Sequence, residues 1–447
     1  MKILLLSFYD LGKQPKIISE LYQKLNNGTN EIDIVDYSVE EKSIKLNDYD
    51  ALGVYASMHT ASVLAEEYLR HKELPSKLFV FGLYAKVFTE IFHNFEIIQN
   101  LDNGDLESLL NVQLNGEYSF KHSVPDRTVL PSITDYSHIV DGSNNLIAGS
   151  VETTYGCKHE CTHCPVPIEF NGTFKTFGTD KILKDVSNQV EAGAKHISFN
   201  DPDFFNGPKH ALKILQALNI EHPEITYDST IKVEHILKYP DYFKELKNLK
   251  MLFVISAFET TNDKVLNILK KNHTSSDLNN AVELSLSNNI DIRPTWMPFS
   301  PWTKKQDLPN IIRMIEEYKL RETVDPIQLT IKLLVPKNSL ILNNPEIDNY
   351  LEEYDPASFS YSWKYKSPDM DKLQIDLFTY VLQNESLDEY AQYLGIVKII
   401  EQHTEQNLLE SGDYNQRIVP KLSETWFCCS EPNKIQLERI KSNKALI

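Results

Sequence analysis

The chain has 447 residues, which is enough for two or three domains with large hydrophobic cores. Its 63 acidic residues outnumber 45 Lys and Arg, and the net charge of −18 opposes binding to nucleic acid and to anionic membranes. No apolar run of about eighteen residues occurs, and the apolar start is too short for a signal peptide, so we expect a cytoplasmic protein. The five cysteines, an odd number concentrated in two places, do not form a disulfide framework.

An α/β domain is predicted for residues 1–125. Apolar runs with β propensity alternate with a helical repeat that includes Ile17, Leu21 and Leu25. The predicted buried parallel strands are Lys2 to Phe8, Ile32 to Val35, Ala51 to Ala56, and Leu78 to Phe81. This pattern favours a doubly wound, Rossmann-like domain. We expect its ligand at the loops that follow strands, which are Tyr9 to Gly12, Ser57 to Thr60, and Gly82 to Ala85.

A second domain is predicted for residues 145–335, after a linker at 126–144. Strand and helix patterns repeat there six times, which favours a partial (β/α)6 barrel with functional residues at the carboxyl ends of strands. The six predicted strands are Ile147 to Thr153, His196 to Phe199, Ile225 to Asp228, Met251 to Ser256, Asp291 to Trp296, and Ile327 to Ile331. Residues 336–447 are assigned to a C-terminal, α-rich extension.

Three cysteines lie within eight residues, at Cys157, Cys161 and Cys164. This spacing suits a 4Fe-4S cluster in which three thiolates hold three irons and the fourth iron stays open to a ligand. The alternative is a structural zinc site with His159 or His163 as the fourth ligand, although no second ligand pair follows at zinc-ribbon spacing.

The C-x3-C-x2-C run resembles the signature of the radical S-adenosylmethionine (radical SAM) superfamily. The resemblance implies that the amino and carboxylate groups of SAM chelate the open iron. It also implies that an electron from the cluster cleaves a carbon–sulfur bond of SAM, and that the electron comes from a flavodoxin- or ferredoxin-type reductant.

Polar residues follow the predicted strands, where that superfamily binds SAM. The segment at Asn200, Asp201 and Asp203 resembles the one that receives the methionine amino group, and Phe258-Glu259-Thr260 is similar to an element whose acid contacts the ribose. For any one of these residues, a capping or loop-forming role is the alternative. The candidate cofactor-binding residues are Asn200, Asp201, Asp203, Thr230, Lys232, Glu234, Glu259, Arg293 and Lys332.

The first domain is similar to the cobalamin-binding domain that precedes many radical SAM cores. However, the Asp-x-His-x-x-Gly element that supplies the lower cobalt ligand in many such domains is missing, and His59 stands in the wrong loop to replace it. Cobalamin therefore stays a doubtful cofactor, and a repurposed domain is the alternative.

The remaining cysteines are adjacent, at Cys428 and Cys429. Adjacent cysteines make a strained disulfide, whereas two neighbouring thiolates can bind trivalent arsenic or another thiophilic species. A buried cysteine beside an idle thiol is the alternative. We favour a substrate-holding or redox role.

The ending Cys-Cys-Ser-Glu-Pro resembles that of the CUAEP/CCAEP-tail radical SAM proteins, a family with members similar to hydroxyarsinothricin synthase. Ser430 stands where the family name has alanine. The resemblance implies transfer of a 3-amino-3-carboxypropyl group from SAM to arsenic that Cys428 and Cys429 hold, with arsenite as the small-molecule partner.

Two other functions remain open. One is a cobalamin-dependent radical SAM methyltransferase or a hydrogen-abstracting enzyme that acts on a small metabolite. The other is a non-enzymatic protein that binds metal or arsenite, although metal storage does not require a barrel with polar strand ends.

Overall fold

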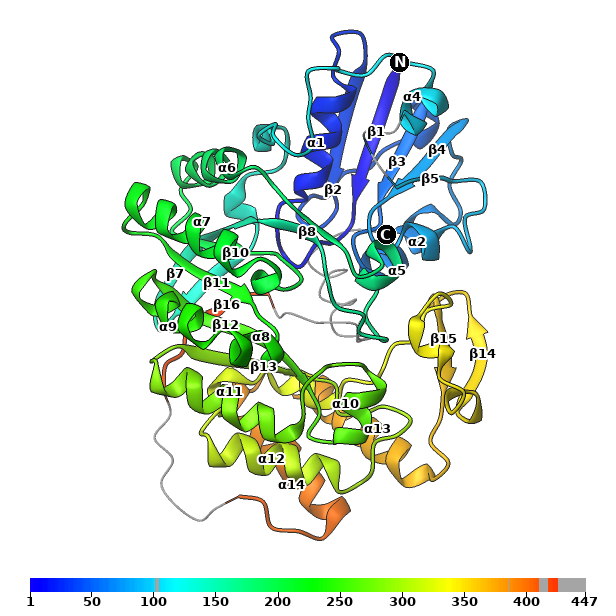
Figure 1. Ribbon diagram of the computed structural model, residues 1–447. Coiled ribbons are helices and arrows are strands. Elements are labelled where there is room, and N and C mark those ends of the chain that lie inside the picture. The colour runs from blue at the N-terminus through cyan, green and yellow to red at the C-terminus, as the bar shows by residue number, and fades with distance from the viewer. Residues whose placement is uncertain (100, 102–103, 385, 410–416, 425–447) are drawn as a thin grey trace.

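In the computed structural model, described for residues 1–99, 101, 104–384, 386–409 and 417–424, helices cover one parallel sheet and one mixed sheet (Figure 1). The mixed α/β fold predicted from the sequence is confirmed. No helix in the described part of the chain is long and apolar enough to cross a membrane.

The first sheet has five parallel strands in the order β2-β1-β3-β4-β5. Its strands are β1 (Lys2–Ser7), β2 (Glu31–Asp36), β3 (Ala51–Tyr55), β4 (Lys77–Phe81) and β5 (Glu96–Ile98), with helices α1 (Lys16–Leu25), α2 (His59–Leu69), α3 (Ala85–Phe88) and α4 (Asp105–Leu110). The four predicted strands are present. The chain order reverses between β1 and β3, which places a ligand crevice at the carboxyl ends of these strands.

The second sheet has seven strands in the order β13-β12-β11-β10-β7-β6-β16. Five are parallel, namely β7 (Asn144–Val151), β10 (His196–Phe199), β11 (Thr226–Thr230), β12 (Met251–Glu259) and β13 (Asp291–Trp296). The short strands β6 (His138–Asp141) and β16 (Lys421–Leu422) extend one edge in antiparallel pairing. The sheet is therefore a half-barrel.

Helices cover the outside of this half-barrel (Figure 1). They are α6 (Thr179–Glu191), α7 (Pro208–Glu221), α8 (Val233–Lys238), α9 (Pro240–Asn248), α10 (Asp263–Ile268), α11 (Ser275–Ser287) and α12 (Asp307–Glu317). The extension adds α13 (Pro368–Gln383), α14 (Glu389–Thr404) and a hairpin of β14 (Leu351–Asp355) and β15 (Ser360–Trp363).

The prediction of a sixth parallel strand at Ile327 to Ile331 is wrong. Pro326–Thr330 forms a 3-10 helix, and Asp325 caps it by accepting a hydrogen bond from the Ile327 amide. Only an isolated bridge between Phe299 and Lys332 continues the sheet direction. A proline directly after an Asp cap is a helix-start signal, and it outweighs the β propensity of the apolar run.

The predicted linker at 126–144 is also structured. It contains two 3-10 turns and β6, which pairs with β7. The boundaries of the three predicted domains stay predictions.

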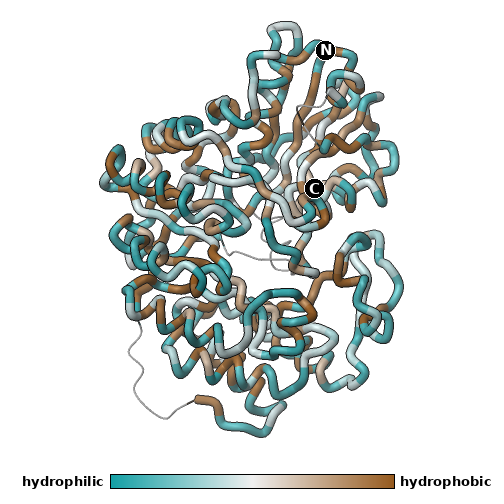
Figure 2. The backbone as a smooth tube through the Cα atoms, in the orientation of Figure 1, coloured by the Kyte–Doolittle hydropathy of each residue, from teal (hydrophilic) through white to brown (hydrophobic). Residues whose placement is uncertain are grey.

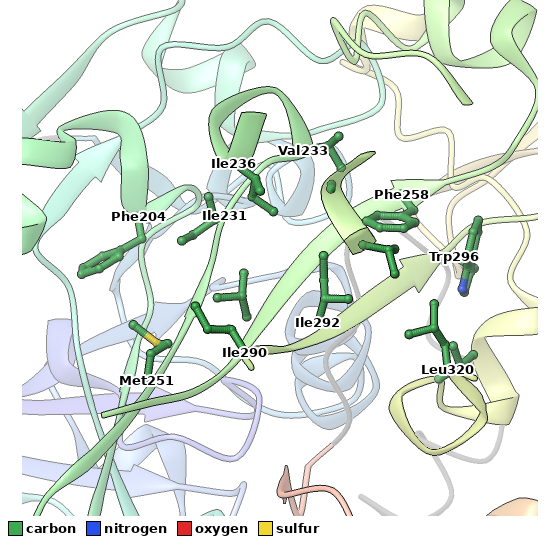
Figure 3. Close-up of a cluster of buried hydrophobic side chains, with 14 of the residues drawn as sticks. Phe204, Ile231, Val233, Ile236, Met251, Phe258, Ile290, Ile292, Trp296 and Leu320 are labelled. Carbon is green, nitrogen blue, oxygen red and sulfur yellow. The ribbon is translucent and has the colours of Figure 1, made fainter. Parts of the chain in front are cut away.

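The hydrophobic core fills the space between sheet and helices, where apolar residues run along the strands (Figure 2). Figure 3 shows part of it, with Phe258 of β12 and Trp296 of β13 packed edge to face at a ring distance of 5.5 Å. This packing holds the strands from which the site residues project.

One buried ion pair and one partly exposed ion pair join α1 to the second half of the fold. Glu20 of α1 is fully buried and lies 2.5 Å from the Nζ of Lys181 on α6, and Lys16 of α1 lies 3.1 Å from Glu152, which follows β7. Each charge has a partner, so the pairing fixes how the two halves meet instead of adding much net stability.

Candidate active site

A cavity of about 930 Å³ lies where the carboxyl ends of the two sheets face each other. Loops after β1, β3 and β4 form one wall, and residues after β7, β10 and β11 form the other. Cys157, Cys161 and Cys164 all line it. The volume is near the upper end of the range for small-molecule sites, which is sufficient for a cofactor and a second small molecule.

The cysteine loop begins at a glycine that no other residue can replace without strain. Gly156 has a φ of +88°, and a Cβ there would lie 2.6 Å from the carbonyl oxygen of Thr173. The short antiparallel pair β8 (Thr154–Gly156) and β9 (Phe174–Thr176) frames the loop, and α5 (Val166–Phe170) follows it. Cys157 and Cys161 are each 7% exposed.

Burial raises the pKa of Cys157 to about 12 and also raises the pKa of Cys161. A nucleophilic cysteine needs a lowered pKa, so these thiols are unsuited to that role. Bound iron supplies the positive charge that deprotonates coordinating thiols. The raised pKa values therefore argue against a nucleophilic role, and metal ligation rests on the spacing of the cysteines and on their place in the cavity.

The sulfur positions argue against a single zinc ion at the cysteines. Zinc with sulfur ligands at 2.3 Å would hold neighbouring sulfurs about 3.8 Å apart. Among the described residues, the only three-residue group with its ligand atoms all within 4.8 Å is His159, Asp203 and His235, so the three sulfurs spread more widely. A cluster that gives each sulfur its own iron suits that spread.

The two histidines of the loop face carboxylates. His159 Nε2 lies 3.2 Å from Asp203, and His163 Nε2 lies 3.2 Å from Glu259. Neither histidine thus joins the cysteines as a fourth ligand, which weakens the zinc alternative further.

Glu259 ends β12 in a buried cluster. Its φ is +64°, a strained value that turns the side chain toward His163 and toward Lys271, whose Nζ is 3.0 Å away. Burial alone would raise the pKa of Glu259, but Lys271 and His163 outweigh burial and hold that pKa at about 2. The carboxylate braces the cysteine loop and is not among the cavity-lining residues.

Four of the nine candidate cofactor-binding residues line the cavity, namely Asn200, Asp201, Thr230 and Lys232. The carboxylate of Asp201 accepts hydrogen bonds from the backbone amides of Thr153 and Thr154, at 3.0 and 2.6 Å, and from both hydroxyls. Asp201 therefore ties the end of β10 to the end of β7. Thr230 and Lys232 remain the best placed to contact a ligand.

The other candidates lie outside the cavity lining. Arg293 donates to the carbonyl oxygens of Glu322 and Pro420, and Lys332 donates to the carbonyl oxygen of Trp363 at 2.7 Å. Their contact with a SAM carboxylate stays a prediction, and neither side chain lines the cavity. Asp203, Glu234 and Glu259 are held in buried groups beside the cysteine loop.

Sequence reasoning missed two lysines of the cavity wall. Lys13, in the loop after β1, hydrogen bonds to Asn200 across the two halves, and Lys271 pairs with Glu259. Lys13 follows a loop already expected to hold a ligand, which is a usable signal. Lys271 lies in an ordinary polar segment, where no sequence signal marks it as a site residue.

Gly12, in the loop after β1, lies next to Glu424 near the end of the described chain. It has a φ of +66°, and a Cβ there would overlap Ser137 and Glu424, whereas Gly28 has a φ of +80° and open space around it.

We expect Gly28→Ala to lower the free energy of unfolding by about 1 kcal/mol from the left-handed backbone alone. Gly12→Ala should cost about 1 kcal/mol more because it adds overpacking. Urea unfolding of both variants measures the difference, and equal costs would contradict the packing role.

Cys428 and Cys429 lie outside the described residues. The last described segment nevertheless borders the site, because Leu422 of β16 lines the cavity and Glu424 accepts a hydrogen bond from the Tyr9 hydroxyl at 3.3 Å.

Residues 151–325 match the family model of the radical SAM superfamily. A putative methylthiotransferase of Methanocaldococcus jannaschii is 22% identical over 45% of this chain and 46% of its own length. The ribosomal protein uS12 methylthiotransferase RimO of Clostridium botulinum is 21% identical over 53% of this chain and 55% of its own. The match thus spans about half the length of each relative.

Solved structures of similar fold are radical SAM enzymes with bound cobalamin or SAM ligands. The cobalamin-dependent enzyme OxsB, with aqua-cobalamin and SAM bound, gives a TM-score of 0.61 at 12% identity over 90% of this chain and 71% of that chain. The methyltransferase TsrM of Kitasatospora setae, with tryptophan and aza-SAM bound, gives a TM-score of 0.57 at 11% identity over 90% of this chain and 99% of that chain. At such identity these likenesses show the fold alone.

Proposed function

We propose that the chain is a radical SAM transferase that moves a carbon group from SAM to a small acceptor, because residues 151–325 match the family model of the radical SAM superfamily. The observation that carries the proposal is the shared cavity. Three cysteines at cluster spacing, the polar end of β11 and the loops of the first domain all line one cavity.

The residues present fit a 4Fe-4S cluster, since Cys157, Cys161 and Cys164 lie on the cavity wall and none of them is in a disulfide. When bound and reduced, such a cluster supplies the electron that breaks a carbon–sulfur bond of SAM. Thr230 and Lys232 offer a hydroxyl and an ammonium to the polar groups of SAM.

One candidate acceptor is trivalent arsenic held by Cys428 and Cys429, with transfer of the 3-amino-3-carboxypropyl group. The adjacent thiols and the Cys-Cys-Ser-Glu-Pro ending support it. Cys428 is four positions after Glu424, and four residue steps span at most about 14 Å. Because Glu424 contacts the loop after β1, this tether is short enough to bring the pair to the cavity.

The second candidate is methyl transfer, which the doubly wound first domain and the fold likeness to TsrM and OxsB favour. The residues do not fit a histidine-ligated cobalamin. His59 Nε2 lies 2.6 Å from the carbonyl oxygen of Ser358, and burial lowers the pKa of His59 to about 4. We therefore assign no step to cobalamin.

The nucleoside product tests these proposals in one experiment. The full chain is reconstituted anaerobically with iron and sulfide, reduced, and given SAM with and without arsenite. Methylthioadenosine that increases with arsenite supports 3-amino-3-carboxypropyl transfer, and S-adenosylhomocysteine supports methyl transfer. 5′-Deoxyadenosine alone would indicate hydrogen abstraction, and intact SAM under all conditions would contradict an enzymatic role.

The double substitution Cys428→Ser, Cys429→Ser is expected to abolish arsenite binding while the iron and sulfide content stays unchanged. Hydroxyls are poor ligands for a soft ion, and the cluster cysteines are unaffected. Arsenite affinity is measured by equilibrium dialysis on both proteins. Unchanged affinity would rule out the pair as the arsenic site.

A further inference from the structure

A second set of potential metal ligands lies beside the cysteine loop, in His159, Asp203 and His235. Each comes from a different element: the cysteine loop, the turn after β10, and α8. Their exposed fractions are 6%, 0% and 0%, and their ligand atoms all lie within 4.8 Å of one another. Such buried convergence is unusual for groups without a shared partner.

The two imidazoles converge on one carboxylate oxygen. Asp203 Oδ2 lies 3.2 Å from His159 Nε2 and 2.5 Å from His235 Nδ1. Despite these short distances, none of the three atoms has a hydrogen bond of acceptable geometry to any described residue. Beyond these ion-pair contacts, a bound cation would satisfy all three buried atoms at once.

The atoms of these side chains that face away from the proposed ligand atoms also have partners, and such partners orient the residues around bound metals. Asp203 Oδ1 accepts from the amides of Phe205 and Lys232, at 3.2 and 3.4 Å, which leaves Oδ2 to face the histidines. The other nitrogen of His159, Nδ1, lies 3.5 Å from Glu234 Oε2. A carboxylate behind the distal nitrogen of a histidine is the usual outer partner of a metal-binding imidazole.

We propose that His159 Nε2, Asp203 Oδ2 and His235 Nδ1 bind one divalent transition-metal ion of the zinc type, separate from the iron–sulfur cluster. Two imidazoles and one carboxylate suit zinc, whereas calcium and magnesium prefer oxygen ligands alone. Bonds of 2.0–2.1 Å in tetrahedral geometry place neighbouring ligand atoms about 3.3 Å apart. The His159 distance already matches, and His235 has to withdraw by less than about 1 Å.

The ion would tie the cysteine loop to the ends of two strands. His159 is two residues from Cys157, so a bond to His159 fixes the loop where the cluster cysteines begin. Asp203 anchors the same ion to β10, and His235 anchors it to the helix after β11. The ion would therefore brace the cysteine loop, a role that goes beyond the proposed transfer reaction.

Metal counting on the reconstituted full chain tests the proposal, with zinc as the probe. Zinc is added, loosely bound ion is removed with a weak chelator, and iron, sulfide and zinc are measured per chain. We expect one zinc per wild-type chain in addition to the cluster iron, and at least a tenfold loss of zinc in His235→Ala with iron retained. His273→Ala, which changes another buried histidine, should keep the zinc.

No zinc in the wild-type chain, or equal zinc in the wild type and His235→Ala, would overturn the proposal. If His235→Ala does not fold, zinc X-ray absorption on the wild-type chain decides. Nitrogen and oxygen neighbours at about 2.0–2.1 Å support the site, and sulfur at about 2.3 Å would place the zinc on cysteines and overturn it. Because iron and zinc are counted separately, loss of the cluster or of SAM cleavage does not affect this result.

Discussion

Cys161→Ala is expected to lose both the iron–sulfur cluster and SAM cleavage. Among the described residues, Cys161 is one of three cysteines on the cavity wall, and removal of one thiolate leaves a second iron without a protein ligand. Iron and sulfide should fall well below four of each per chain after reconstitution, and nucleoside formation should fall to background. Chemical iron and sulfide analysis and chromatography of the nucleosides measure both.

A cysteine substitution elsewhere provides the control. Cys428→Ser removes a thiol of similar chemistry outside the loop and should leave iron and sulfide at the wild-type level. If Cys161→Ala kept a full cluster, another residue would have to replace it, and the assignment of Cys157, Cys161 and Cys164 would fail.

Glu259→Gln is expected to lower the free energy of unfolding by about 3 kcal/mol at pH 7. The pKa of Glu259 falls from 4.5 in the unfolded chain to about 2 in the fold, and each unit is worth about 1.4 kcal/mol. The side chain is 2% exposed and its partner Lys271 is 4% exposed, so solvent screens the pair little. Urea unfolding at pH 7 measures the loss.

The pH dependence gives this prediction a specific sign. A lowered pKa stabilises the fold fully above pH 4.5, and that contribution is lost as pH falls toward 2. The difference in the free energy of unfolding between wild type and Glu259→Gln should therefore decrease as the pH falls from 4.5 toward 2. Glu31→Gln is the control, since its ion pair with Lys2 is 68% exposed on the glutamate side and should matter by less than about 1 kcal/mol. A gap independent of pH would show that charge is not the cause.

The parallel strands could be predicted because each is a buried apolar run that turn residues interrupt. The predicted limits of the strands at His196 and Asp291 agree with β10 and β13 to the residue. The edge strands β6 and β16 could not be predicted, because they are short and polar and pair only through the folded chain. The failed strand at Ile327 shows that a local Asp-Pro start decides between a strand and a 3-10 helix.

Site residues close in sequence were easier to predict than those brought together by folding. The cysteine spacing is local, and all three cysteines line the cavity. The position of Asp203 beside His159 and His235 depends on the cysteine loop, the turn after β10 and helix α8 meeting, which a single sequence does not show. The SAM roles of Arg293 and Lys332 rested on nearness to strand ends, whereas both side chains turn toward backbone carbonyls.

Electron paramagnetic resonance of the reduced, reconstituted full chain tests the central claim most directly. If the cluster at Cys157, Cys161 and Cys164 keeps an open iron on the cavity wall, SAM binds to that iron and changes the g values of the signal. Cys161→Ala should show no such signal. A normal 4Fe-4S signal that SAM leaves unchanged would contradict the account.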